Sequence, residues 1–161
     1  MLKAKLDRST RARLYNTTVL PAMLYACETW ATTKRKERRL MTAQRAMERT
    51  MLGLSLRDHI RNDEIRERSG VKDVIAEYKE SKFRWAGHVA RFTDGRWTRA
   101  VVEWYPREWK RPLGRPPLRW EDEIRKRMGS TWSRTARSRT VWKRHCDQRI
   151  QLESRQPGRS R

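Results

Sequence analysis

Arginine and tryptophan alternate at high density between Lys82 and Trp120. This stretch has ten Lys or Arg residues against three acidic residues, a net charge of +7. Its five tryptophans are Trp85, Trp97, Trp104, Trp109 and Trp120. An arginine can fork onto phosphate oxygens, and an indole ring can stack on a base or pack in a core. The stretch therefore indicates either nucleic-acid binding or the packing of a small aromatic core.

We expect basic residues of this stretch to contact a phosphate backbone and one tryptophan to stack on bases. One of these basic residues, Lys82, also shares an inward-facing helical stripe with Tyr78, Trp85 and Val89. Trp109 is the stacking candidate because it lies in a basic turn punctuated by prolines. The candidate backbone contacts are Lys82, Arg84, Arg91, Arg96, Arg99, Arg107, Lys110, Arg111, Arg115 and Arg119. The alternative is that some of these charges only solvate a helix face.

The segment 111–116 reads Arg-Pro-Leu-Gly-Arg-Pro and is too rich in proline and glycine for regular helix. An extended Gly-Arg-Pro core could place Arg115 in a narrow minor groove. Its alternative is a semi-rigid spacer whose arginines pair with acids such as Glu121.

The sequence offers no catalytic, metal-binding or cofactor-binding set. His59, His88 and His145 are not at metal-ligand spacing with Cys27 or Cys146. No glycine-rich phosphate loop and no activated nucleophile is visible. We therefore predict that this stretch of protein is not itself an enzyme and needs no cofactor.

Composition supports a polyanionic partner. The chain has 161 residues, and its 40 Lys and Arg against 19 Asp and Glu give a formal net charge of +21. The longest apolar run, 19–27, contains Pro21 and is far shorter than the ~20 residues that span a membrane. We expect nucleic acid, RNA or DNA, as partner and no membrane.

Apolar residues recur at helical spacing throughout, and no strand pattern competes, so the sequence predicts an all-α fold. It is a small multi-helix domain with an extended Pro/Gly/Arg linker and a disordered C-terminal tail. The expected helices are 8–31 with a kink at Pro21, 34–54, 62–68, 74–92, 96–104, 120–128 and one from Thr131.

Two apolar stripes are expected to face the core. In helix 34–54 the stripe is Leu40, Ala43, Met47 and Met51, with Ala46 and Leu54 in support. Four tryptophans also fall at helical spacing, which favours core anchors over stacking platforms: Trp85, Trp97, Trp104 and Trp120.

Several motifs stand in a fixed order along the chain. They are Leu-Pro-Ala-Met-Leu-Tyr-Ala-Cys-Glu-Thr-Trp at 20–30, Ala-Gln-Arg-Ala-Met-Glu-Arg at 43–49, Arg-Trp-Ala-Gly-His-Val-Ala-Arg at 84–91, Arg-Trp-Thr at 96–98, Glu-Trp-Tyr-Pro-Arg at 103–107, Gly-Arg-Pro-Pro at 114–117 and Arg-Trp at 119–120. Together they resemble the C-terminal end of the endonuclease-reverse transcriptases of non-LTR (LINE-type) retrotransposons, the RTE-like group especially. The resemblance covers roughly residues 14–142. Ala26 stands where the family commonly has glycine, and Ser138 where it often has aspartate.

The resemblance implies a piece downstream of the polymerase palm. Residues 1–54 would be a thumb-like helical segment, 55–147 a basic C-terminal extension and 148–161 a disordered tail. The palm's Ala-Asp-Asp metal motif is absent from these 161 residues, so no catalytic residue carries over. The parent polypeptide would be an RNA-directed DNA polymerase with an endonuclease, and its palm would be a partner.

The expected role is to hold element RNA and target DNA during target-primed reverse transcription, in a nuclear or cytoplasmic ribonucleoprotein. Two alternatives stay open at this point. One is a stand-alone basic helical component of a ribonucleoprotein, and the other is a decayed copy without function.

Overall fold

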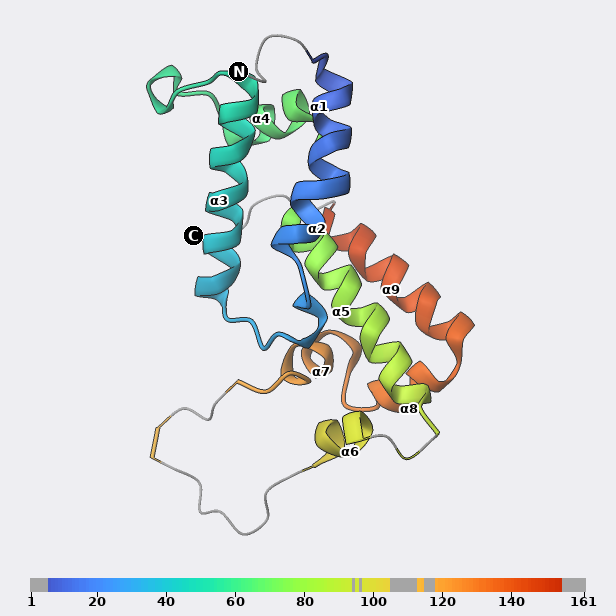
Figure 1. The fold of residues 1–161 in the computed structure, drawn as a ribbon. Helices are drawn as coiled ribbons and strands as arrows, with labels where there is room; N and C mark the ends of the chain where they lie inside the picture. The colour runs from blue at the N-terminus through green and yellow to red at the C-terminus, as the bar shows by residue number, and fades with distance from the viewer. Residues whose placement is uncertain (1–5, 94, 96, 105–112, 115–117, 155–161) are drawn as a thin grey trace. The chain divides into compact units, whose positions relative to one another are not determined.

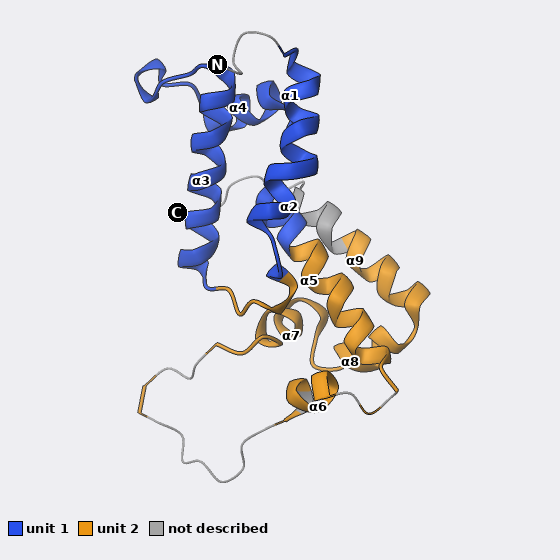
Figure 2. Cartoon of the chain, viewed as in Figure 1, with its two compact units in different colours: residues 1–27, 33–78 blue, residues 28–32, 79–161 orange. Residues whose placement is uncertain are grey.

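The computed structural model describes residues 6–93, 95, 97–104, 113–114 and 118–154, and these residues form helices and connecting turns without any strand (Figure 1). The all-α prediction is confirmed. The chain divides into two compact units (Figure 2). Unit 1 comprises residues 1–27 and 33–78, and unit 2 comprises residues 28–32 and 79–161. The sequence division at residues 54 and 147 concerns the domains of a longer protein and stays a prediction.

Unit 1 begins with a broken helix. Helix α1 (Arg8–Leu14) starts where the Asp7 side chain accepts hydrogen bonds from the backbone N–H groups of Ser9 and Thr10. Hydrogen bonds from the Ser9 and Thr10 side chains, with smaller contributions from the backbone N–H groups, lower the pKa of Asp7 to about 2. A π-helical turn, η1 (Tyr15–Val19), follows and leads into α2 (Leu20–Met23).

The π-helical turn lies directly before Pro21, where the sequence predicted a kink. Proline lacks the N–H that would bond the carbonyl four residues earlier, and a widened turn accommodates its ring. The 3₁₀ turn η2 (Cys27–Thr29) then ends this part of the chain, short of the predicted residue 31.

Helix α3 (Lys34–Leu52) is the longest helix of unit 1. The Thr33 hydroxyl accepts the N–H of Lys36 at its start, and Gly53 adopts a left-handed conformation (φ 72°) at its end, as the sequence predicted. The 3₁₀ turn η3 (Leu56–Asp58) and helix α4 (Asn62–Ser69) follow. Helix α4 begins at Asn62, as the sequence predicted, and Arg61 occupies the extended cap position before it.

Helix α5 (Val74–Arg91) contributes its first five residues to unit 1 and the rest to unit 2. The Asp73 carboxylate accepts the N–H groups of Ile75 and Ala76, which confirms the predicted cap. The remaining helices of unit 2 are α6 (Trp97–Glu103), α7 (Asp122–Met128), α8 (Trp132–Arg137) and α9 (Arg139–Ser154).

The C-terminal boundary differs from the prediction. Residues 148–154 were expected to begin a disordered tail, but α9 continues through them. Residues 155–161 lie outside the described residues, as does most of the predicted linker. Among the described residues, no helix is long and apolar enough to cross a membrane.

The core of unit 2 is aromatic. Trp132 and Trp142 are buried with their ring centroids 6.2 Å apart, and they pack with Phe83, Ala86 and Ile124. The Trp142 indole donates to the Phe83 carbonyl at 2.8 Å, so its polar atom is satisfied inside the core. Helices α5, α7, α8 and α9 are therefore held by ring packing.

The interior of unit 1 is partly polar. The buried residues of α3 are Glu37, Gln44 and Glu48, whereas Ala43, a member of the predicted apolar stripe, is exposed. The predicted orientation of α3 is therefore wrong. The reason is a double hydrogen bond, because the Gln44 amide donates to the Lys72 carbonyl (2.6 Å) and accepts the Val74 N–H (3.0 Å). Those bonds turn the polar face of α3 inward.

Candidate nucleic-acid interface

The structure separates the predicted contact residues into described and undescribed ones. Six of the eleven lie outside the described residues, so their prediction stays a prediction: Arg96, Arg107, Trp109, Lys110, Arg111 and Arg115. The other five belong to unit 2, and each has its own environment there.

Lys82 is buried and not available at the surface. It is 1% exposed, and its Nζ donates to the Glu123 carboxylate at 3.0 Å and to the Trp30 carbonyl at 2.9 Å. The ammonium also lies 6.0 Å from the centre of the Trp120 ring. Lys82 therefore joins α5, α7 and the segment 28–32 within unit 2, and this arrangement corrects its prediction as a phosphate contact. The sequence placed Lys82 on the inner stripe of its helix, and that signal could have excluded it.

The four described arginines of the predicted set make protein contacts. Arg84 pairs with Glu80 one turn earlier. Arg91 donates to the Ala136 carbonyl at 2.8 Å, and Arg99 donates to the Phe92 carbonyl at 3.2 Å. Arg119 is exposed, and its backbone N–H bonds the Asp122 carboxylate. These contacts connect unit 2 internally and leave part of the Arg84 and Arg119 side chains at the surface.

The tryptophans divide differently from the prediction. Trp97 and Trp104 were expected in the core but are 84% and 68% exposed. Trp85 and Trp120 are half-buried, Trp85 against the edge of Phe92 and Trp120 with its indole donating to the Glu28 carbonyl at 2.6 Å. The buried tryptophans belong to α8 and α9. Helical periodicity therefore identified the apolar faces of the helices but did not show which of these faces is buried.

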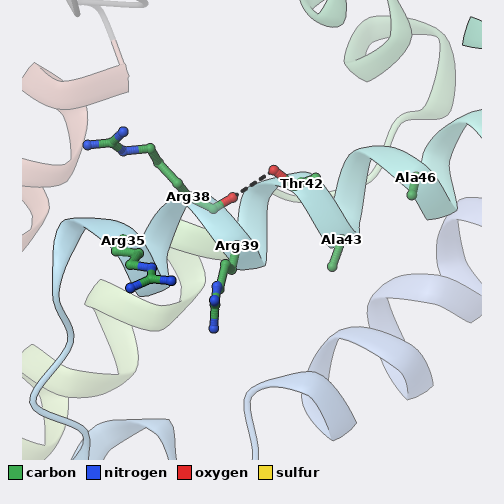
Figure 3. Close-up of a pocket in the computed structure, with 6 residues that line it drawn as sticks. All are labelled: Arg35, Arg38, Arg39, Thr42, Ala43 and Ala46. Atoms are coloured by element: carbon green, nitrogen blue, oxygen red, sulfur yellow. Dashed lines mark hydrogen bonds between the residues drawn. The ribbon is translucent and has the colours of Figure 1, made fainter.

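A second group of basic residues, which the sequence did not single out, lies on α3. Arg35, Arg38 and Arg39 are exposed, and none of them has an ion pair with a described residue. With Thr42, Ala43 and Ala46 they line an open hollow of about 460 Å³ (Figure 3). Figure 3 shows the three arginine side chains extending from the first turns of α3 and the short side chains of the two alanines on the turns that follow.

The charge arrangement on α3 does not favour the helix itself. Arg35 and Arg39 are four residues apart, a like-charge spacing that costs about 0.2–0.5 kcal/mol in an isolated helix. Lys34, Arg35 and Lys36 also begin the helix, where the macrodipole favours acids, and Glu37 is the only acid of the first turn. Because these basic residues lower the stability of the helix, their presence indicates a surface that binds an anion.

Other arginines of the chain differ from those of α3 because they pair with acidic residues. Arg68 pairs with Glu64 and Arg125 pairs with Glu121, each at a spacing of four residues. Exposed basic residues that have no ion pair with a described residue also occur on α8 and α9 of unit 2. They are Arg134, Arg137, Arg139, Lys143 and Arg144. Paired and unpaired basic residues both lie in charge-rich stretches of the sequence, so only the contacts of the folded chain distinguish them.

The buried charges of unit 1 lie behind the α3 surface. Glu48 is fully buried, and neither of its carboxylate oxygens accepts a hydrogen bond from a described residue. Burial raises the pKa of Glu48, although the guanidinium groups of Arg66 and Arg45 oppose that shift. Burial also raises the pKa of Tyr15, with the charge of Glu48 adding to it.

The described residues hold no group of three or more His, Cys, Asp and Glu side chains close enough to bind a metal ion. Neither Cys27 nor Cys146 forms a disulfide with a described residue. Burial raises the pKa of Cys146 to about 11, and the charges of Asp147 and Glu80 add to the shift.

The chain is similar to a transposon-derived protein of Caenorhabditis elegans. The two are 36% identical over an alignment of 149 residues, and the match covers 84% of this chain and 53% of the relative. The chain thus spans about half the length of the relative that it matches. No protein-family model matches the chain. No solved structure matches it. The likeness supports a transposon-related origin for the chain.

Proposed function

We propose that this chain is a nucleic-acid-binding part of a longer transposon-encoded protein and that it acts without catalytic residues of its own. The observation that carries the proposal is the α3 surface, where Arg35, Arg38 and Arg39 surround an open hollow and lack acidic partners among the described residues. Guanidinium groups in this state can bind phosphate oxygens and release the counterions of a nucleic acid.

The parent protein in this proposal is the endonuclease-reverse transcriptase of a non-LTR retrotransposon, in which the chain would follow the palm. The ordered motifs of residues 20–120 and the transposon-derived relative support this assignment. The chain would then hold element RNA or target DNA for the palm during reverse transcription, within a nuclear or cytoplasmic ribonucleoprotein.

Two charge-matched variants test the binding surface. Arg35→Gln with Arg39→Gln removes two unpaired cations from α3, while Arg68→Gln with Arg125→Gln removes two cations that already pair with glutamates. Both variants lower the net charge by two. Binding of a fluorescein-labelled 20-nucleotide RNA and of a DNA duplex is measured by anisotropy over a range of salt concentrations.

The α3 variant should reduce the slope of log affinity against log salt by about 1.4 on the RNA and about 1.8 on the duplex, because each lost phosphate contact removes about 0.7 or 0.9. The paired-arginine variant should change the slope by less than half as much. Equal slopes in the two variants would contradict the assignment to α3.

The parent protein is tested separately by sequencing the transcript upstream of Met1. An open frame that continues into a palm with an Ala-Asp-Asp motif would support the polymerase assignment. Translation that starts at Met1 would contradict it, while the binding proposal would still depend on the salt measurements.

A further inference from the structure

Helix α6 turns an apolar face outward. Trp97 and Val101 of α6 and Trp104, the residue that follows the helix, are 84%, 67% and 68% exposed, and their spacing of four and three residues is that of one helix face. Ala100, between them, is also exposed. The opposite side is the one that packs, because Val102 contacts the aromatic core of unit 2.

The position of α6 is fixed by contacts that do not involve these rings. Arg99 donates to the Phe92 carbonyl at 3.2 Å, and Phe92 in turn packs on the edge of Trp85 with ring centroids 6.0 Å apart. Val102 adds the contact with the core. The two exposed indoles therefore contribute little to the fold, and substituting them leaves the anchors of α6 in place.

The two indoles lie seven residues apart, which is ~10 Å along a helix axis at 1.5 Å per residue. Two large exposed rings at this separation form a platform for more than one flat group. An exposed tryptophan does not serve solubility, and two other tryptophans of this chain, Trp132 and Trp142, are buried.

The charge of the chain indicates which kind of molecule binds to this platform. The chain carries a net charge of +21, and the sequence segment 96–119, which contains α6, has seven Lys or Arg against two acids. An apolar protein surface offers no complement to that charge. A single-stranded nucleic acid offers both a phosphate backbone and unpaired bases with free π faces, whereas a duplex hides those faces.

We infer that Trp97 and Trp104 form a base-stacking platform that makes the chain prefer single-stranded RNA or DNA to duplex. This inference deepens the proposed nucleic-acid binding and rests on it. Val101 lies between the two rings and fills the space between the stacked bases with apolar surface.

The test replaces both tryptophans together in the full chain. Trp97→Ala with Trp104→Ala removes the rings, Trp97→Phe with Trp104→Phe keeps a π face, and Trp97→Leu with Trp104→Leu keeps apolar area without one. Each variant is titrated against a labelled 12-nucleotide single strand, the same length of duplex and a single strand of abasic sites. Far-UV circular dichroism confirms that each variant is folded.

The alanine variant should lose about tenfold or more in affinity for the single strand and keep its affinity for the duplex. The phenylalanine variant should recover most of that loss, the leucine variant little of it. On the abasic strand, the affinity of the wild-type protein should be no higher than that of the alanine variant.

Different failures have different meanings. If wild-type protein binds none of the three probes, the proposed function is wrong and the platform with it. If wild-type protein binds and the alanine variant loses equally on single strand and duplex, or leucine restores binding as well as phenylalanine, only the platform is wrong. Self-association that the alanine variant loses, with unchanged oligonucleotide affinity, would assign the face to a protein partner.

Discussion

The two units bury different kinds of residues. In unit 2 the core is made of rings, with Trp132 and Trp142 in contact and Phe83 beside them. In unit 1 the long helix α3 buries Gln44 and Glu48. Rings stabilise a fold by excluding water without needing a partner for every atom, whereas a buried amide or carboxylate stabilises only when it is bonded.

This difference leaves unlike surfaces behind. Because α3 turns its polar face inward, its arginines and small alanines lie outside, where they line the hollow. Because the core of unit 2 is filled by the tryptophans of α8 and α9, the tryptophans on the outer face of α6 are left exposed. In both units the surface proposed to bind nucleic acid is the side of a helix that the core did not use.

All eight tryptophans belong to unit 2, so the two cores can be followed separately. Tryptophan fluorescence reports on unit 2 alone, and far-UV circular dichroism reports on the helices of both units. The variants below use these two signals to compare the cores.

The largest effect is expected for Trp142→Ala. Removing a buried indole that packs on Trp132 and donates to Phe83 should lower the free energy of unfolding by about 3–5 kcal/mol. Chemical denaturation followed by fluorescence measures it. Trp97→Ala is the matched control and should change stability by less than ~0.5 kcal/mol, since its ring is exposed. Equal losses in both would contradict the core assignment.

Lys82→Met should come next. The substitution leaves the Glu123 carboxylate and the Trp30 carbonyl without their shared donor, and breaking a buried pair typically costs about 3 kcal/mol. Replacing both Lys82 and Glu123 with methionine should recover part of the loss, because the two buried charges are then removed together. The recovery should be incomplete, since Arg127, which lies 3.8 Å from the Glu123 carboxylate, loses that contact. A double variant less stable than the single one would show that the pair itself does not dominate.

A smaller loss is expected for Gly87→Ala. A Cβ atom at this position of α5 would lie 2.6 Å from the Trp142 ring, closer than such atoms approach, so overpacking should cost about 1–3 kcal/mol. Alanine is otherwise preferred to glycine within a helix by ~1 kcal/mol. A stabilised variant, measured by thermal unfolding, would mean that the ring gives way and that the core of unit 2 is loosely packed.

The smallest effect depends on pH and belongs to unit 1. The raised pKa of Glu48 means that the folded state favours the protonated acid, so this residue supports folding below its ordinary pKa near 4.5 and loses that contribution as pH rises through the folded value. Tyr15, Asp73, Arg45, Arg49 and Arg66 are the charged or titratable groups acting on it. Glu48→Gln should therefore gain midpoint temperature relative to wild type as pH rises from 4 to 8, seen by circular dichroism. A constant difference would contradict the assignment.

The sequence was sufficient for much of the helical framework. Gly53 and Asp73 act at helix ends through backbone geometry or their own hydrogen bonds, so their local chemistry predicted the end of α3 and the start of α5. The prediction of α9 was less accurate, because residues 148–154 were grouped with the C-terminal tail as disordered although the helix continues through them.

The orientation of α3 could not be predicted from its periodicity. Its apolar stripe and its polar face both recur at helical spacing, and the choice between them depends on Gln44 meeting two backbone groups of residues 72 and 74. Similarly, counting basic residues could not show that Lys82 is buried or that Arg84 is paired. Contacts between residues distant in sequence decide these questions, and no local pattern contains them.

The most direct test of the central claim is the salt dependence of binding by the wild-type protein. Anisotropy of a labelled 20-nucleotide RNA, measured from 50 to 400 mM salt, gives the slope of log affinity against log salt. The unpaired arginines of α3, with those of α8 and α9, predict a slope of about −2 or steeper, since each phosphate contact contributes about −0.7. A flat slope, or no binding at the lowest salt, would contradict nucleic-acid binding by this chain.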